Sequence, residues 1–195
     1  MGLSALTNIA KATIISETKS LVTKNKHSFT RQARKLGQPQ RWRIKLSTAP
    51  LPYQQAMGIY AQLASLDGVY GKDSLPCPLP QIGSALSVKN RVARAIGASS
   101  VDAIVLAKEA GDAIGIGDFI QFAGHKKVYQ VTLFNSESGE VQFYPKLKSA
   151  VGASEQIKVG KDVEFYVYSQ DSDTEISITA ARPVPVNIEL VEVTQ

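Results

Sequence analysis

The chain is poor in the side chains that most often build redox, metal or covalent chemistry. It has one cysteine, Cys77, and two histidines, His27 and His125. A single cysteine excludes an internal disulfide and a structural zinc site, so the fold must be held together by burial. A catalytic thiolate needs an activating base, and neither histidine lies in a recognisable catalytic motif. We therefore expect Cys77 to be a small apolar filler between Pro76 and Pro78.

Other catalytic signatures are also missing. The sequence has no Gly-x-Ser-x-Gly, His-Glu-x-x-His, P-loop or Cys-x-x-Cys motif. Gly115-Ile116-Gly117 precedes an expected strand, whereas a phosphate-binding turn opens a helix. Asp171 and Asp173 share a loop, but a calcium loop needs more ligands and a glycine at its turn. These observations predict a protein that is not an enzyme and that binds no cofactor and no metal.

Long hydrophobic runs are absent as well. No segment approaches the roughly 18 apolar residues of a membrane span, and residues 1–12 lack the charged and continuous apolar regions of a secretory signal. The composition, 44% hydrophobic and 20% charged over 195 residues, is ordinary for a soluble globular protein with one domain or two small ones. We expect no membrane partner and no export.

Acidic residues are scarce in the first third of the chain. Residues 1–66 hold ten Lys and Arg but only one acid, Glu17, which gives +9. Residues 67–195 hold twelve Lys and Arg against sixteen Asp and Glu, which gives −4. Such asymmetry suits head-to-tail stacking of subunits or docking on an acidic partner, through complementary potentials. It would also suit nucleic acid, because phosphates attract a basic surface.

One strand pattern combines an apolar face with a charged one. In residues 40–47 two sets of side chains alternate, Trp42, Ile44 and Leu46 against Arg41, Arg43 and Lys45. Alternating side chains of a strand point to opposite faces. The three cations repel one another unless they are spread in solvent or meet an acidic surface. The face is therefore either a solvated exterior or a contact with an acidic neighbour.

A single helix is expected after this strand. Pro52 suits a first helical turn, and apolar residues recur at spacings of three and four from Tyr53 to Ala64. Gly68 lies where a left-handed C-cap is expected. The apolar stripe indicates core packing rather than a ligand site.

Most other segments have strand patterns. In residues 117–132 two apolar runs flank a short connection, residues 123–127, which predicts a tight β-hairpin. Residues 69–80 have a loop composition. Residues 81–86 are expected to form a strand, and residues 88–97 either a strand or a short helix. Further strands are expected at residues 28–34, ended by Gly37 and Pro39, and at 101–108, 140–144, 163–168, 175–179 and 186–191. The pattern predicts an antiparallel, mainly β protein built as barrels or a sandwich.

Several segments follow one another in an order shared with a known family. A Trp-bearing strand, Gln40-Arg41-Trp42-Arg43-Ile44, and a Pro-started helix come first. Three segments follow, Gly117-Asp118, His125-Lys126-Lys127-Val128-Tyr129-Gln130-Val131-Thr132 and Phe143-Tyr144-Pro145-Lys146-Leu147, and the chain closes with Ile188-Glu189-Leu190-Val191-Glu192-Val193. The series covers about residues 28–193 and resembles the distal tail (Dit) proteins of long, flexible-tailed bacteriophages.

This resemblance implies a fold and a division of the chain. The fold would be a tail-tube-like antiparallel β-barrel or sandwich with one flanking α-helix and an inserted small β-barrel like an oligonucleotide/oligosaccharide-binding (OB) fold. Residues 1–26 would form an N-terminal arm, residues 27–86 plus 149–195 the tail-tube-like domain, and residues 87–148 the insert.

The resemblance also implies a function. The chain would be a virion protein, assembled in the host cytoplasm, that forms a hexameric ring at the tail tip. It would join the tail-tube protein to the baseplate hub or tape-measure protein, and the only nucleic acid it would meet is DNA passing through the channel. The residues expected at a subunit or partner interface are Arg41, Arg43, Lys45, His125, Lys126 and Lys127.

Two other functions remain open from the residues. One is another tail component of related fold, such as a tail-tube or tail-completion protein. The other is a single-stranded nucleic-acid-binding protein with a small barrel, in which Trp42, Tyr53 and Tyr60 would stack on bases beside a basic groove.

Overall fold

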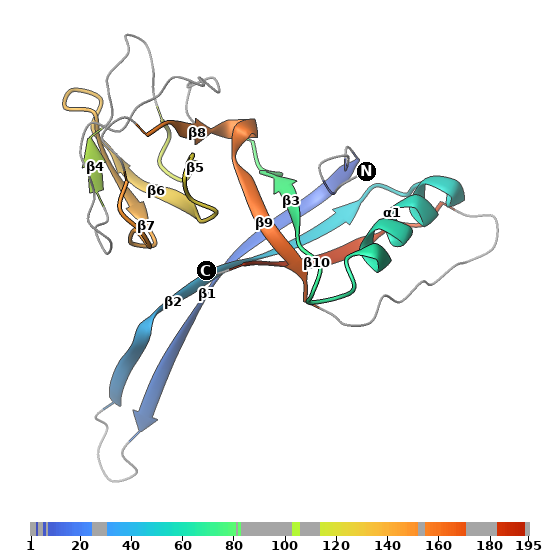
Figure 1. The fold of residues 1–195 in the computed structure, drawn as a ribbon, viewed down its shortest axis with the longest axis horizontal. Helices are drawn as coiled ribbons and strands as arrows, with labels where there is room; N and C mark the ends of the chain where they lie inside the picture. Colours follow the sequence, from blue (N-terminus) through green and yellow to red (C-terminus); the bar gives the residue numbers. More distant parts are fainter. Residues whose placement is uncertain are drawn as a thin grey trace.

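In the computed structural model the described residues are 3, 6, 8–24, 31–80, 82, 103–105, 114–151, 155–170 and 183–193. Within these residues the chain is mainly β, with two five-stranded antiparallel sheets and one α-helix (Figure 1). The prediction of a mainly β, antiparallel protein is confirmed. Neither sheet, as described, closes on itself, because each has a linear strand order with two open edges.

The first sheet brings together both ends of the sequence. Its strand order is β1-β2-β10-β9-β3, in which every neighbouring pair is antiparallel. The strands are β1 (Ile9–Lys24), β2 (Arg31–Thr48), β10 (Asn187–Glu192), β9 (Glu164–Ser169) and β3 (Asp73–Pro76). Strand β3 lies in a segment that the sequence predicted to be a loop. Its four residues end in Pro76 and are flanked by Gly71, Pro78 and Pro80, which hid the strand pattern.

The second sheet is formed by the middle of the chain. Its order is β4-β7-β6-β5-β8, again antiparallel throughout. The strands are β4 (Ala103–Val105), β7 (Glu140–Tyr144), β6 (Val128–Phe134), β5 (Phe119–Phe122) and β8 (Ile157–Val159). The predicted β5–β6 hairpin is confirmed, and the short 3-10 helix η2 (Gly160–Asp162) leads from β8 back to the first sheet.

Strands β1 and β2 form one long hairpin, which differs from the prediction in two ways. Residues 9–24 pair with β2, so they belong to the first sheet and do not form a separate arm. Strand β2 also continues through Gly37 and Pro39, where the sequence predicted an end. The register moves from Thr18↔Gln40 to Ser20↔Lys35, so the extra residues of β2 form a bulge. A bulge tolerates both Gly and Pro, because its residues leave the regular ladder.

The α-helix covers part of the apolar face of the first sheet. Helix α1 (Tyr53–Ser65) begins directly after Pro52, which confirms the predicted helix. It buries Ala56, Tyr60 and Leu63, but Tyr53 and Ala64 are exposed, so the buried stripe is narrower than predicted. The chain then turns through two residues of positive φ, Asp67 and Gly68. No helix among the described residues is long and apolar enough to cross a bilayer.

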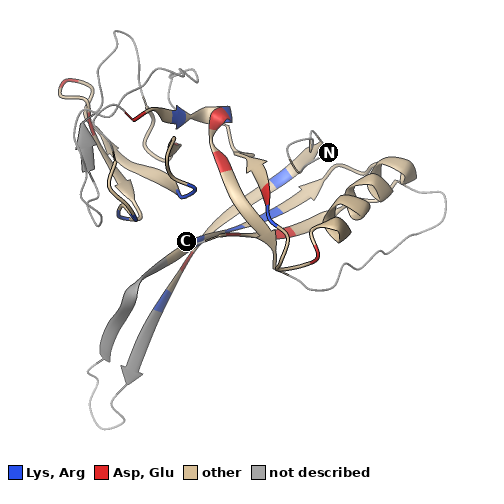
Figure 2. Cartoon of the chain, viewed as in Figure 1, with Lys and Arg blue, Asp and Glu red and all other residues tan. Residues whose placement is uncertain are grey.

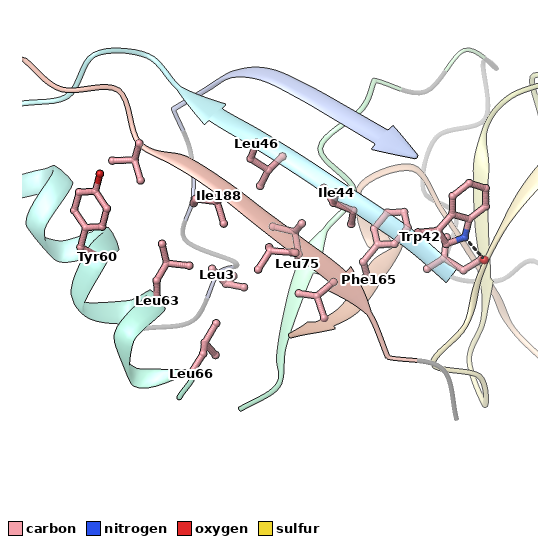
Figure 3. Packing of buried hydrophobic residues seen from close by; sticks show 14 of the residues in the cluster. Leu3, Trp42, Ile44, Leu46, Tyr60, Leu63, Leu66, Leu75, Phe165 and Ile188 are labelled. Atoms are coloured by element: carbon pink, nitrogen blue, oxygen red, sulfur yellow. Dashed lines mark hydrogen bonds between the residues drawn. The ribbon is translucent and has the colours of Figure 1, made fainter. Parts of the chain in front are cut away.

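A continuous core joins this helix to the first sheet and to the first residues of β5 and β6 in the second. Figure 3 shows Tyr60, Leu63 and Leu66 of the helical segment facing Leu46 and Ile188 of the sheet. Trp42, Phe119 and Phe165 extend the same core toward the second sheet, with Phe119 edge-on to both other rings. Each fully buried large side chain stabilises the fold by about 1.5–3 kcal/mol relative to exposure.

The second sheet has an aromatic core of its own. Phe122, Tyr129 and Phe143 meet in edge-to-face pairs with ring centroids 5.2–5.9 Å apart. Ile120, Val141 and Val159 fill the space around them. Two cores of this kind are compatible with two domains, but their limits stay predictions. Strand β8 pairs with β5, so the second sheet reaches past residue 148, where the expected insert ends.

Some sequence predictions fall outside the described residues. These are the strand at 175–179, the segment 88–97, most of 81–86, and most of the buried strand at 101–108, of which β4 is the described part.

Candidate functional site

The basic face of β2 meets acids from its own sheet. Arg41 Nε lies 2.7 Å from a Glu17 carboxylate oxygen, and Arg43 also contacts Glu17. Arg43 Nη1 and Lys45 Nζ lie 3.1 and 2.9 Å from the two carboxylate oxygens of Glu189. The ladder of five charges is therefore Glu17, Arg41, Arg43, Glu189 and Lys45. Figure 2 colours Lys and Arg blue and Asp and Glu red along the chain.

Strand register explains this ladder. Arg41 lies directly opposite Glu17 of β1, and Lys45 lies directly opposite Glu189 of β10. Opposite residues of an antiparallel pair share a face, with Cβ atoms about 5 Å apart. Arg43 lies between the two acids and reaches both. Each half-exposed pair contributes only about 0–1 kcal/mol.

The ladder changes the interpretation of this face. The sequence left two possibilities for the three cations, solvent or the acidic surface of a neighbour. The structure supplies acids from within the sheet, so the face is mixed in sign rather than basic. Reversing the charge of Arg41, Arg43 and Lys45 would place five acids on this face, and it would disturb the fold as well as any contact with a partner.

Lys127 is buried where the two sheets meet. Its ammonium contacts the Glu192 carboxylate, and the two side chains are 6% and 0% exposed. The ammonium also donates to the Gln40 backbone oxygen at 3.2 Å and lies 5.8 Å from the Trp42 ring centroid. Lys127 directly precedes β6 of the second sheet, whereas its three partners belong to β10 and β2 of the first.

The other polar groups of this contact are paired too. Glu192 accepts hydrogen bonds from the backbone N–H groups of Val128 and Trp42, at 3.0 and 3.2 Å. The Trp42 indole N–H donates to the Val128 oxygen at 2.8 Å, drawn as a dashed line in Figure 3. We call Trp42, Lys127, Val128 and Glu192 the junction. It fixes β6 against β2 and β10 by charge-assisted and neutral hydrogen bonds in a buried site.

Burial dominates the electrostatics of the junction. It raises the pKa of Glu192, and the Lys127 charge and two backbone N–H groups oppose this rise. Burial likewise lowers the pKa of Lys127, against the attraction of Glu192. Desolvation therefore works against both charged forms, and each ion depends on the other to remain charged.

His125 and Lys126 lie in the hairpin connection before the junction. His125 is buried; its ring contacts the Tyr129 hydroxyl through Nδ1 and the Ser149 hydroxyl through Nε2, at 3.1 Å each. Burial raises the pKa of Tyr129 to about 12, so its hydroxyl stays protonated. Lys126 is exposed and lies 4.6 Å from the Tyr166 ring centroid.

Burial therefore corrects the expected interface at two positions. The sequence grouped His125, Lys126 and Lys127 as candidates for contact with a partner. His125 and Lys127 are 8% and 6% exposed and are occupied by contacts within the chain. The hairpin pattern shows where the turn lies but not that it points at the other sheet. Lys126 keeps the exposure that a contact needs.

Gly117 and Asp118 build the turn that starts β5. Gly117 has φ +101°, a conformation that disfavours side chains. The Asp118 carboxylate accepts from the backbone N–H groups of Gly115 and Ile82, at 2.7 and 2.5 Å. The motif therefore orients the hairpin whose far end carries the junction, and a structural role accounts for both residues.

Cys77 lies partly buried against the first core, as expected for an apolar filler. Burial raises the pKa of its thiol, which opposes thiolate formation at neutral pH. Among the described residues, no three His, Cys, Asp or Glu side chains are grouped so that they could hold a metal ion.

The sequence analysis did not identify Glu192. It noted the closing strand, but an acid in an alternating strand is ordinarily exposed. Its only sequence signal is that Glu192 lies within the short run Leu190-Val191-Glu192-Val193, in which the other three residues are apolar.

Neither a scan against protein-family models nor a search of curated proteins finds a match to this chain. The fold and the junction define a mainly β protein in which two antiparallel sheets are joined by a buried ion pair. The resemblance to distal tail proteins stays a prediction.

Proposed function

We propose that this chain is a structural subunit of a bacteriophage tail, a distal tail protein that forms a ring between tail tube and baseplate. In this proposal the first sheet and α1 correspond to the tail-tube-like domain, and the second sheet to the inserted small OB-like barrel. The ring is a hexamer at the tail tip of the virion, and its partners are the tail-tube protein and a hub or tape-measure protein.

The observation that carries the proposal is where the family-like segments fall. Gly117-Asp118 starts β5, Lys127-Val128-Tyr129 enters β6, and the closing strand supplies Glu192. Lys127, Val128 and Glu192 therefore lie where the two sheets meet, and Gly117-Asp118 starts the hairpin that carries this contact. A subunit of a ring needs two such modules in a fixed relation, because a small rotation between them would change the angle at which copies meet.

The open edges of the first sheet support the same proposal. Strands β1 and β3 end the sheet on its two sides in the described part of the chain. Exposed edges present unpaired backbone groups, and proteins cover such edges or use them to bind another chain. Head-to-tail contacts between copies would bring two different edges together, as a closed ring requires.

The stacking version of the nucleic-acid alternative is disfavoured. Trp42 and Tyr60 are 2% and 8% exposed, so neither ring can stack on a base. Tyr53 is 53% exposed, whereas its place in the apolar stripe had suggested burial. One exposed ring does not make the platform that single-strand binders use.

The test is the oligomeric state of the purified chain. Size-exclusion chromatography with light scattering should give a single closed oligomer, and negative-stain images should show rings with a central opening. The expected mass is six times 21.0 kDa. Extended tubes would favour a tail-tube protein instead. A strict monomer at high concentration that also fails to bind tail-tube protein would overturn the proposal.

A further inference from the structure

The β1–β2 hairpin extends past the strand that flanks it. Strand β10 pairs with β2 only between Arg43 and Ser47. Beyond the bulge, Ser20–Lys24 pairs with Arg31–Lys35, and in the described part of the chain these ten residues pair only with each other. We call residues 20–24 and 31–35 the ribbon. Figure 1 shows the ribbon projecting away from both sheets, over about 17 Å at 3.4 Å per residue.

The ribbon segment has charge of one sign only. Residues 19–35 contain six Lys and Arg and neither Asp nor Glu. A two-stranded ribbon has no core of its own and is marginally stable. A run of like charge on a projecting hairpin attracts an external anion.

The positive charge continues into a groove at the base of the ribbon. This groove, of about 600 Å³, is lined by Ser16, Glu17, Thr18, Lys19, Gln40, Arg41 and Arg43. Three of these side chains are cations and one is an acid. Lys19 is exposed there. Arg41 and Arg43 contact Glu17 within the ladder, so the positive charge that the groove adds outside the ladder is that of Lys19.

A second copy of this chain is the less suitable partner. Four acids of the body already have a cation as partner within the chain. Glu17 and Glu189 hold the ladder, Glu192 is buried in the junction, and Glu164 pairs with Lys158. Nucleic acid, by contrast, offers a regular row of unpaired negative charges.

We propose that the ribbon binds the phosphate backbone of double-stranded nucleic acid. A two-stranded β-ribbon has the width that the major groove of B-DNA admits. Contacts between Lys or Arg and phosphates carry no sequence information, so the binding is independent of sequence. This inference stands without the proposed ring, since the ribbon belongs to a single chain.

The test uses the full chain and a fluorescein-labelled 20-base-pair DNA duplex of arbitrary sequence. Fluorescence anisotropy would measure the Kd at 50 and 200 mM NaCl. Four phosphate contacts, each releasing about 0.9 counterion, predict that Kd rises about 100-fold between these salt concentrations.

Two matched variants locate the binding. The ribbon variant carries Lys24→Gln, Arg31→Gln, Arg34→Gln and Lys35→Gln. The body variant removes the same charge at four exposed lysines, through Lys11→Gln, Lys72→Gln, Lys146→Gln and Lys161→Gln. The ribbon variant should weaken binding at 50 mM salt by about tenfold or more, and the body variant by less than about threefold, because only direct phosphate contacts release counterions.

A third variant controls for misfolding of the ribbon. Replacing residues 19–39 by Asn-Gly closes the hairpin on the pair Thr18↔Gln40 with a two-residue turn. This variant should keep the far-UV circular dichroism of a folded β protein and lose DNA binding.

Three results would overturn the inference. They are no binding of the unmodified chain at 50 mM salt, equal losses in the ribbon and body variants, and binding to poly-glutamate but not to DNA. The last result would assign the ribbon to an acidic protein. Rings that do not bind DNA would reject this inference alone, and a DNA-binding monomer would reject only the proposed ring.

Discussion

Replacing Lys127 by methionine tests the junction most directly. Methionine keeps an unbranched stem of similar length but removes the charge. The Glu192 carboxylate would then lie 0% exposed without its cation. Removing one partner of a buried ion pair costs about 3–5 kcal/mol, because the remaining charge stays desolvated.

The structure places the expected loss within this range. Glu192 keeps two backbone N–H donors, from Val128 and Trp42, which partly stabilise the unpaired carboxylate. Against this, the variant also loses the hydrogen bond from Lys127 to the Gln40 oxygen, which contributes about 1 kcal/mol. We expect a loss of about 3–4 kcal/mol at pH 7.

The single tryptophan provides the assay. Trp42 is the only Trp of the chain, and its indole lies in the junction. Urea unfolding followed by Trp fluorescence and by far-UV circular dichroism would report the junction and the whole fold, respectively. The control is Lys158→Met, which removes one partner of an exposed pair with Glu164 and should cost less than about 1 kcal/mol.

The loss should also depend on pH, with a definite sign. Burial raises the folded-state pKa of Glu192, and removing Lys127 raises it further. When the pKa of Glu192 is higher in the folded than in the unfolded state, protonation of Glu192 stabilises the fold. This contribution is fully present below the unfolded-state pKa, near 4.5, and is lost as pH rises through the folded-state pKa. The difference between Lys127→Met and the unmodified chain should therefore be smaller at pH 4.5 than at pH 7.

The double variant Lys127→Met/Glu192→Gln completes the cycle. Its loss of unfolding free energy should be smaller, by about 1–3 kcal/mol, than the sum of the losses for Lys127→Met and Glu192→Gln, because neither charge is left unpaired. A loss below 1 kcal/mol for Lys127→Met at pH 7, or a loss that does not change with pH, would refute a buried ion pair at this site.

Two further predictions concern packing. Trp42→Phe removes the indole N–H that donates to the Val128 oxygen. It should lower the free energy of unfolding by about 1–3 kcal/mol, measured by circular dichroism as a shift of the urea midpoint. An unchanged midpoint would contradict this hydrogen bond. Gly71→Ala would place a Cβ 1.9 Å from the Leu66 oxygen, so the backbone must shift, at a cost of about 1–3 kcal/mol. Gly58→Ala is its matched control, because nothing lies within 4 Å of the added Cβ in helix α1; it should stabilise by about 0.5–1 kcal/mol. Thermal unfolding would rank the three variants, and equal effects of the two glycine substitutions would show that the Leu66 contact is relaxed.

Local patterns were sufficient to predict much of the fold. The alternation from Gln40 to Ser47, the stripe that begins after Pro52, and the β5–β6 hairpin are all set by neighbours within a few residues. The long hairpin could not be predicted in this way. Residues 9–24 show little alternation, and they form a strand because β2 offers a partner along their whole length. Pairing over such distances overrides local propensity.

The candidate site was harder to predict, for a reason of the same kind. Arg41, Arg43 and Lys45 share a face because they alternate, but whether they lack counterions depends on which strands lie alongside. Glu17 and Glu189 lie 24 and 148 residues from Arg41, and no local pattern brings them together. Lys127 and Glu192 are the extreme case, since each looks like a surface residue until its partner is known.

The junction also constrains how the sequence of this protein can change. An apolar residue at position 127 leaves a buried carboxylate without its cation. An apolar residue at position 192 leaves a buried ammonium without its counter-charge and two backbone N–H groups without an acceptor. Either single change costs several kcal/mol, a large part of the stability of most domains. A joint change to uncharged residues can be nearly neutral for stability. Relatives of this chain should therefore keep both charges or replace both, and a relative with one charge alone should have a different partner in the junction. Sequencing relatives tests this pairing without any assay of function, and frequent single replacements would show that the two sheets are held together by other contacts.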